Sequence, residues 1–139
     1  MGFDHIDTRV ASVAAVEPFY DRLMPLLGFT LKKPSFVDAE GNWSAVGPDE
    51  PYNTIEYYAP AGEGSATFFI GFIERADTPT TWTRIAFRVT DATDTEWPTI
   101  LREIGAKKIE PSEDMNAYPA IFFEDPGGTK LELVSRRPP

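Results

Sequence analysis

The stretch His5-Ile6-Asp7-Thr8-Arg9-Val10 recurs in outline as Arg84-Ile85-Ala86-Phe87-Arg88-Val89, 79 residues further along the chain, with identical residues at three of six positions. The alternation of apolar and other residues in both copies is typical of a strand with one buried face. Each copy is followed by a short polar or small-residue stretch, a helical pattern and a glycine that begins another strand-like run. A repeat on this scale indicates two related halves.

Each half is predicted to contain one amphipathic helix, because its apolar residues follow a helical spacing. The spacing residues are Val16, Phe19, Tyr20, Leu23 and Leu27 in the first half, and Trp97, Ile100, Leu101 and Ile104 in the second. Proline is tolerated only in a first turn, so Pro18 places the first helix start near residues 14–16 and Pro25 should kink or end it. The second helix should be capped within residues 93–95 and end at Gly105.

The remaining apolar runs predict strands at 4–10, 29–33, 43–47, 54–59, 66–73, 82–90, 106–110, 119–124 and 129–135. The tetrapeptide Asp125-Pro126-Gly127-Gly128 predicts a hairpin between the last two. Residues 34–42 and 48–64 are interpreted as loops. The expected fold class is therefore α+β, with two tandem β-α-β-β-β modules whose curved mixed sheets form a concave site, helices outside. The modules span 1–74 and 82–139, joined by a linker at 75–81.

Composition favours a single domain over residues 1–139. The chain carries 13 Lys+Arg against 22 Asp+Glu, a formal net charge of −9, and no cysteine, which excludes disulfides and thiolate zinc sites. The acidity argues against a nucleic-acid partner. No apolar run approaches the roughly 18 residues of a membrane span, and the first residues do not resemble a signal peptide. By default we expect no membrane partner and a cytoplasmic location.

Strand alternation predicts which side chains share a face, because a packed helix takes the apolar set. Ile6, Thr8 and Val10 should face the helix, as should Leu131 and Leu133. The opposite face then gathers Arg9, Arg84, Arg88 and Lys130 against Asp7 and Glu132, with His5 on the same side. This cationic excess favours a pocket for an anionic small molecule. Alternatively, these charges pair across the strands, Arg84 with Glu132 for example, or lie at open sheet ends.

Several aromatic residues accompany this polar face. Phe68 to Phe72, Trp82, Phe122 and Phe123 are interpreted mainly as core residues. Tyr118, Tyr57 and Tyr58 could each place a hydroxyl at the mouth of a pocket, and Tyr118 is taken as a candidate substrate-binding residue.

The two β-α-β-β-β halves resemble the vicinal oxygen chelate superfamily. The motifs that carry this resemblance are the opening Asp4-His5-Ile6, the Leu27-Gly28-Phe29 step, and the closing Asp125-Pro126-Gly127-Gly128 with Leu131-Glu132-Leu133. This superfamily includes glyoxalase I, bleomycin-resistance proteins, fosfomycin-resistance enzymes and extradiol dioxygenases. The resemblance implies metal ligands at His5 and Glu132. The two other ligand positions carry Arg84, which cannot coordinate a metal, and an apolar residue of the 68–70 run. The sequence therefore leaves two alternatives for the cofactor. Either a divalent metal binds at this site, or His5 and Glu132 act as an acid and a base without a metal.

The resemblance leaves the function open between classes. The leading hypothesis is a glyoxalase-like lyase or isomerase that acts on a small oxygenated, anionic metabolite and has a degenerate metal site. The residues expected to bind the substrate are Arg9, Arg84, Arg88, Lys130 and Tyr118. The alternative is a non-catalytic drug-binding protein like the bleomycin-resistance group. A third is a structural or regulatory domain without chemistry. By resemblance we also expect a homodimer.

Overall fold

The structure is a computed structural model that describes residues 4–60, 67–79 and 83–136. Within these residues the first half contains β1 (His5–Val10), α1 (Val13–Leu26), β2 (Leu31–Val37), β3 (Trp43–Ala45), β4 (Thr54–Ala59) and β5 (Phe68–Glu74). The second half contains β6 (Arg84–Arg88), α2 (Glu96–Glu103), β7 (Lys107–Pro111), β8 (Ala120–Glu124) and β9 (Lys130–Val134). The predicted α+β fold with two similar modules is confirmed.

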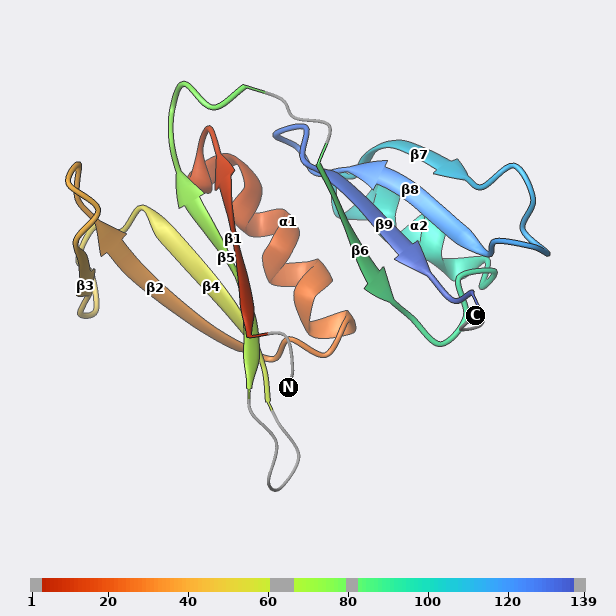
Figure 1. Cartoon of the computed structure of the whole chain (residues 1–139), viewed down its shortest axis with the longest axis horizontal. Coiled ribbons are helices and arrows are strands. Elements are labelled where there is room, and N and C mark those ends of the chain that lie inside the picture. The colour runs from red at the N-terminus through yellow and green to blue at the C-terminus, as the bar shows by residue number, and fades with distance from the viewer. Residues whose placement is uncertain (1–3, 61–66, 80–82, 137–139) are drawn as a thin grey trace.

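The strands form two mixed sheets that lie side by side (Figure 1). In the described part of the chain, the orders are β1-β5-β4-β2-β3 and β6-β9-β8-β7. The first strand of each module is an edge strand that pairs in parallel with the module's last strand, in the registers His5↔Phe69 and Arg84↔Lys130. The two repeated hexapeptides therefore occupy equivalent places, and β1 and β6 are the edges that face each other.

The loop predicted at residues 34–42 is wrong for its first part, because β2 continues to Val37. Residues 34–35 pair with β4 and residues 35–37 with the short strand β3. Pro34 cannot donate a ladder hydrogen bond, but it can occupy a strand where its missing N–H is not required. Composition alone therefore placed the end of the strand too early.

The helices occupy the predicted regions with small differences at their ends. Ser12 caps α1 by accepting a hydrogen bond from the Ala15 amide, and the Glu74 carboxylate accepts one from the Val13 amide. These two acceptors start α1 at Val13, so Pro18 lies beyond the first turn, contrary to prediction. The second helix ends as expected, with Gly105 at a φ of +97°.

The core joins the two modules through α1. The ring of Phe19 lies 6.5 Å from that of Phe123 on β8, and the ring of Tyr20 stacks on Phe72 of β5 at 3.9 Å. Leu131 and Leu133 are fully buried in the same cluster, as strand alternation predicts. Among the predicted core aromatics, Phe72 and Phe123 are buried, Phe68 is 41% exposed, and Trp82 lies outside the described residues.

Across the described ranges, we find no helix with the length and apolar character that crossing a bilayer requires.

Candidate functional site: a cavity between the two modules

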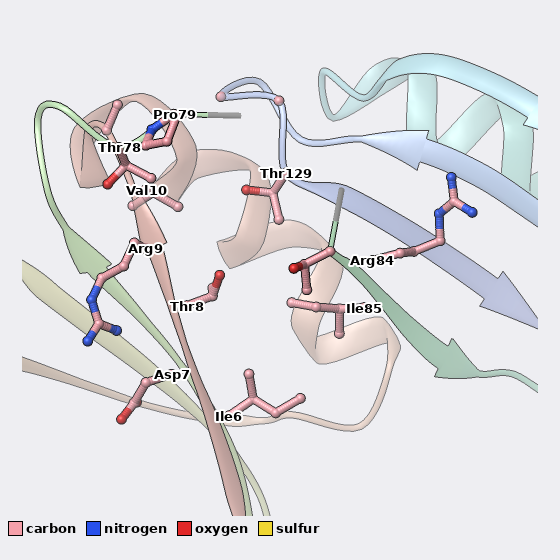
Figure 2. Close-up of a pocket in the computed structure, with 14 residues that line it drawn as sticks. Ile6, Asp7, Thr8, Arg9, Val10, Thr78, Pro79, Arg84, Ile85 and Thr129 are labelled. Atoms are coloured by element: carbon pink, nitrogen blue, oxygen red, sulfur yellow. The ribbon is translucent and has the colours of Figure 1, made fainter. Parts of the chain in front are cut away.

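A cavity of about 400 Å³ lies where β1 approaches the second module. One wall is Ile6–Ala11, and the others are Thr78 and Pro79, the start of β6 at residues 83–85, and the β8–β9 turn at residues 127–129 (Figure 2). A site built from the facing edges of two modules is a common location for small-molecule ligands. The cavity is thus the principal candidate in this part of the molecule.

Arg9 and Arg84, two of the predicted substrate-binding residues, both line this cavity. Their guanidinium groups lie on either side of it and point away from each other (Figure 2). Within the described residues, neither arginine has an ion pair with a carboxylate within 4.0 Å. Two guanidinium groups without a carboxylate partner leave this part of an acidic protein locally cationic, even with Asp7 in the lining.

Arg84 does not form the ion pair with Glu132 that one interpretation of the sequence suggested. Its guanidinium lies over the ring of Phe122, 4.6 Å from the centroid. Phe122 stands opposite Glu132 in the β8–β9 register, so the ring and the carboxylate occupy the same face of the sheet. The stacking holds the Arg84 guanidinium on this face of the sheet.

Glu132 is almost fully buried on β9, and its Oε1 accepts a hydrogen bond of 2.7 Å from the Tyr118 hydroxyl. That hydrogen bond is the main cause of a raised pKa for Tyr118, which therefore stays protonated and able to donate. The predicted substrate-binding tyrosine is thus engaged with the predicted acid–base residue.

His5 lies at the start of β1, in the other sheet. Its Nδ1 lies 2.6 Å from a carboxylate oxygen of Asp4, and its ring stacks on Phe69 with centroids 4.5 Å apart. The hydrogen bond that His5 donates to Asp4, with further contributions from the charges of Asp7 and Glu56, raises the pKa of His5. The imidazole is therefore held toward its protonated form rather than toward a free base.

The other two predicted cationic residues are engaged by groups of the protein. Arg88 donates a hydrogen bond of 2.8 Å to the backbone carbonyl of Arg136. Lys130 lies 4.0 Å from Glu124, which also pairs with Lys108 at 3.3 Å. Of the four cationic residues predicted on this face, Arg9 and Arg84 are therefore the two that lie at the cavity.

The residues present do not fit the divalent metal that the resemblance implies. His5 and Glu132 lie on separate sheets, and each already has its own partner. The described residues contain no group of three or more His, Cys, Asp or Glu side chains that could hold a metal ion. A catalytic zinc site normally uses three protein ligands, so the donor set of one chain falls short.

The sheet brings Asp7 and Glu56 together across β5. Both are in register with Gly71, and a Cβ on Gly71 would lie 2.5 Å from Oδ1 of Asp7 and 3.7 Å from Cγ of Glu56. Glu56 is buried and accepts a hydrogen bond from Tyr58, whose pKa burial raises to about 12. The missing side chain at Gly71 makes room for the Asp7 carboxylate, a relationship that only the strand register reveals.

Thr78, Thr129 and the glycines of the β8–β9 turn were also missed as site residues. They lie in the linker and in the turn, where no periodic pattern predicts the direction of a side chain. The Asp125-Pro126-Gly127-Gly128 signature did predict the turn itself, and Gly128 has the positive φ of +94° expected of it.

A second cavity of about 400 Å³ lies beside α1 and is lined by Glu17, Asp21, Glu74 and Tyr52 among others. Its acidic groups already have partners. Lys32 pairs with Glu17 and Asp21, the hydroxyl of Tyr52 donates to Glu17, and Glu74 caps the helix. We therefore interpret the carboxylates of this second cavity as structural groups.

Three solved structures illustrate what the chain is similar to. FosX, a fosfomycin resistance protein from Listeria monocytogenes, superposes with a TM-score of 0.61 at 16% identity, over 99% of this chain and 94% of that one. The bleomycin resistance determinant encoded on the transposon Tn5 superposes with a TM-score of 0.57 at 16% identity, over 99% of this chain and 100% of that one. An integron cassette protein from the Halifax Harbour sewage outfall superposes with a TM-score of 0.58 at 15% identity, over 96% of this chain and 97% of that one.

These likenesses extend over nearly the whole chain and show its fold. No protein-family model matches the sequence. No curated protein matches it either.

Proposed function

We propose that this chain, which has the fold of the vicinal oxygen chelate superfamily, binds a small oxygenated anion in the cavity between β1 and β6. The observation that carries this proposal is the pair of arginines. Arg9 and Arg84 border one cavity without an ion pair to any described carboxylate, in a protein of net charge −9. Two cations that border one cavity make the local potential positive, and this arrangement favours an anionic ligand.

The chemistry of the lining agrees with an oxyanion. The positive charges of Arg9 and Arg84 at its borders favour a carboxylate or phosphonate ligand in the cavity. The hydroxyls of Thr8, Thr78 and Thr129 line the same cavity and can donate to or accept from further oxygens of the ligand. A crystal structure of a mutant FosX from Listeria holds Mn(II) together with 1S,2S-dihydroxypropylphosphonic acid, an oxygen-rich anion, in a protein of the same fold.

Turnover of the ligand by a lyase or isomerase reaction is the further part of this proposal. His5 and Glu132 would serve as the acid and the base, which requires both groups at one ligand. In one chain they lie on separate sheets. We therefore propose that catalysis uses a homodimer in which the second chain supplies one of the two groups, whereas anion binding requires only the cavity of a single chain.

Isothermal titration calorimetry tests the binding with methylphosphonate and lactate as anionic probes and bleomycin as a cationic drug. We expect Arg9→Ala and Arg84→Ala each to weaken binding of the anions about tenfold, since each removes a positive charge from the border of the cavity. Arg102→Ala is the matched control, because Arg102 lies on the exposed last turn of α2. It should change affinity by no more than about twofold.

Equal affinities in the wild type and both cavity variants would contradict the proposal. Binding of bleomycin without binding of either anion would instead support the drug-binding alternative.

A further inference from the structure

Asp125, in the β8–β9 turn, is a fully buried carboxylate with three hydrogen-bond donors. The hydroxyl of Tyr20 donates to Oδ2 at 2.6 Å, and the amides of Gly127 and Thr129 donate to Oδ1 at 2.8 and 2.9 Å. A buried carboxylate is stable only when its oxygens are satisfied in this way. One side chain therefore binds both its own turn and a helix of the other module.

Tyr20 is held rigidly at the other end of this link. Its ring is fully buried, stacks on Phe72 and contacts Phe19 edge-on with centroids 5.0 Å apart. Burial, followed by the proximity of Asp125, raises the pKa of Tyr20 well above its usual value. The hydroxyl thus stays protonated and able to donate to Asp125.

The turn that Asp125 organises is also a wall of the anion cavity. Residues 127–129 line it, opposite β1. The backbone at Gly127 lies directly on α1, because a Cβ there would be 3.2 Å from Cγ1 of Val16. The hydrogen bond from Tyr20 therefore couples the core of the first module to the far wall of the cavity.

We propose that Tyr20 and Asp125 are positioning residues for the ligand cavity, because they set the separation between β1 and the Gly128–Thr129 wall. This inference rests on the proposed function, since it takes the cavity between β1 and β6 as the anion site. It goes further in assigning a role in affinity to two buried residues that do not line the cavity. Loss of the link should loosen the wall and reduce affinity while the fold persists.

Tyr20→Phe tests this inference, with Tyr57→Phe as a matched control. Tyr57 is also buried, also contacts Phe72 and also donates to a carboxylate, Asp21 at 2.9 Å, but it does not line or hold the cavity. Calorimetry with methylphosphonate should show about a fivefold weaker affinity for Tyr20→Phe and about a twofold change or less for Tyr57→Phe. Amide hydrogen exchange at Gly127 and Thr129 should accelerate only in Tyr20→Phe.

A second pair of variants separates positioning from simple loss of stability. Asp125→Asn keeps an oxygen that accepts from both turn amides, whereas Asp125→Ala removes every acceptor. Asp125→Asn should retain more of the wild-type affinity at a temperature where both variants are folded by circular dichroism.

The inference is overturned if Tyr20→Phe binds methylphosphonate like the wild type, or if both tyrosine variants lose affinity equally. If the wild type binds neither methylphosphonate nor lactate, the proposed function itself fails, which is a distinguishable result.

Discussion

The guanidinium of Arg84 lies over the ring of Phe122, with its central carbon 4.6 Å from the ring centroid. This contact explains how the chain accommodates a permanent cation at a position where the resemblance implies a metal ligand. A guanidinium over an aromatic face is attracted by the ring and keeps its N–H groups free at its edges. In the proposed function, these N–H groups are the donors that would bind the anion.

Replacing Phe122 with leucine should weaken anion binding although Phe122 carries no charge. Without the ring, Arg84 loses a cation–π contact worth about 0.5–1 kcal/mol, so affinity for methylphosphonate should fall about two- to fivefold. Phe36→Leu on β2 is a matched control, because Phe36 is exposed and, in the described part of the chain, no cation lies over its ring. Calorimetry on the three proteins checks this, and an unchanged affinity in Phe122→Leu would exclude a role for the stacking.

The single histidine of the chain provides a direct test of the electrostatics around β1. The hydrogen bond with Asp4, and then the charges of Asp7 and Glu56, raise the pKa of His5 above its usual value of about 6.5. A raised pKa means that this interaction stabilises the fold below the unfolded-state pKa and that the contribution is lost as pH rises through the folded-state pKa. An NMR titration of the imidazole should show the raised pKa.

Asp4→Asn should lower the pKa of His5 more than Asp7→Asn does, since the Asp4 hydrogen bond is the largest cause. A His5 pKa at or below the ordinary value in the wild type would contradict the arrangement of carboxylates described above.

The strand register of the second sheet predicts opposite outcomes for two neighbouring residues. Leu131 is fully buried in the core, so Leu131→Asp places an unpaired carboxylate there and should cost about 4 kcal/mol of unfolding free energy. Lys130 lies on the opposite face near Glu124, and Lys130→Ala should cost about 1 kcal/mol or less. Urea unfolding measures both values, and similar losses would argue against this register.

A homodimer remains a prediction that light scattering can test. Among the described residues, the edge strands β3 and β7 have backbone groups without a sheet partner on one side. The exposed apolar residues include Leu31 and Trp43. A symmetric partner chain would cover such edges. The expected result at micromolar concentration is the mass of two chains. The mass of one chain would rule out the dimeric route to catalysis while leaving the anion cavity untouched.

Local periodicity predicted most of the fold because it reports which face of each element is buried. The alternation in β1 and β9 placed Val10, Leu131 and Leu133 in the core, and the repeat at residues 5 and 84 identified equivalent strands. The contact between Tyr20 and Asp125 could not be predicted in this way. It joins residues 105 positions apart, and no local pattern encodes the docking of α1 on both sheets.

The candidate site was predicted less completely for a related reason. Arg9 and Arg84 were identified because they belong to the repeated strands, and they do border one cavity. The side-chain direction of Arg84 depends on the ring of Phe122, which lies two strands away in the sheet order. The predicted ion pair between Arg84 and Glu132 was therefore wrong. Thr78 and Thr129 come from a linker and a turn, whose positions depend on the packing of the two modules.

The central claim is that this cavity binds an oxyanion through arginine rather than through a divalent metal. Calorimetric titration of methylphosphonate into the wild-type protein, once with EDTA and once with added Mn(II), tests it most directly. We predict the same affinity in both titrations, with a difference of no more than about twofold, because the two guanidinium groups supply the positive charge. Binding that occurs only in the presence of Mn(II) would contradict the account.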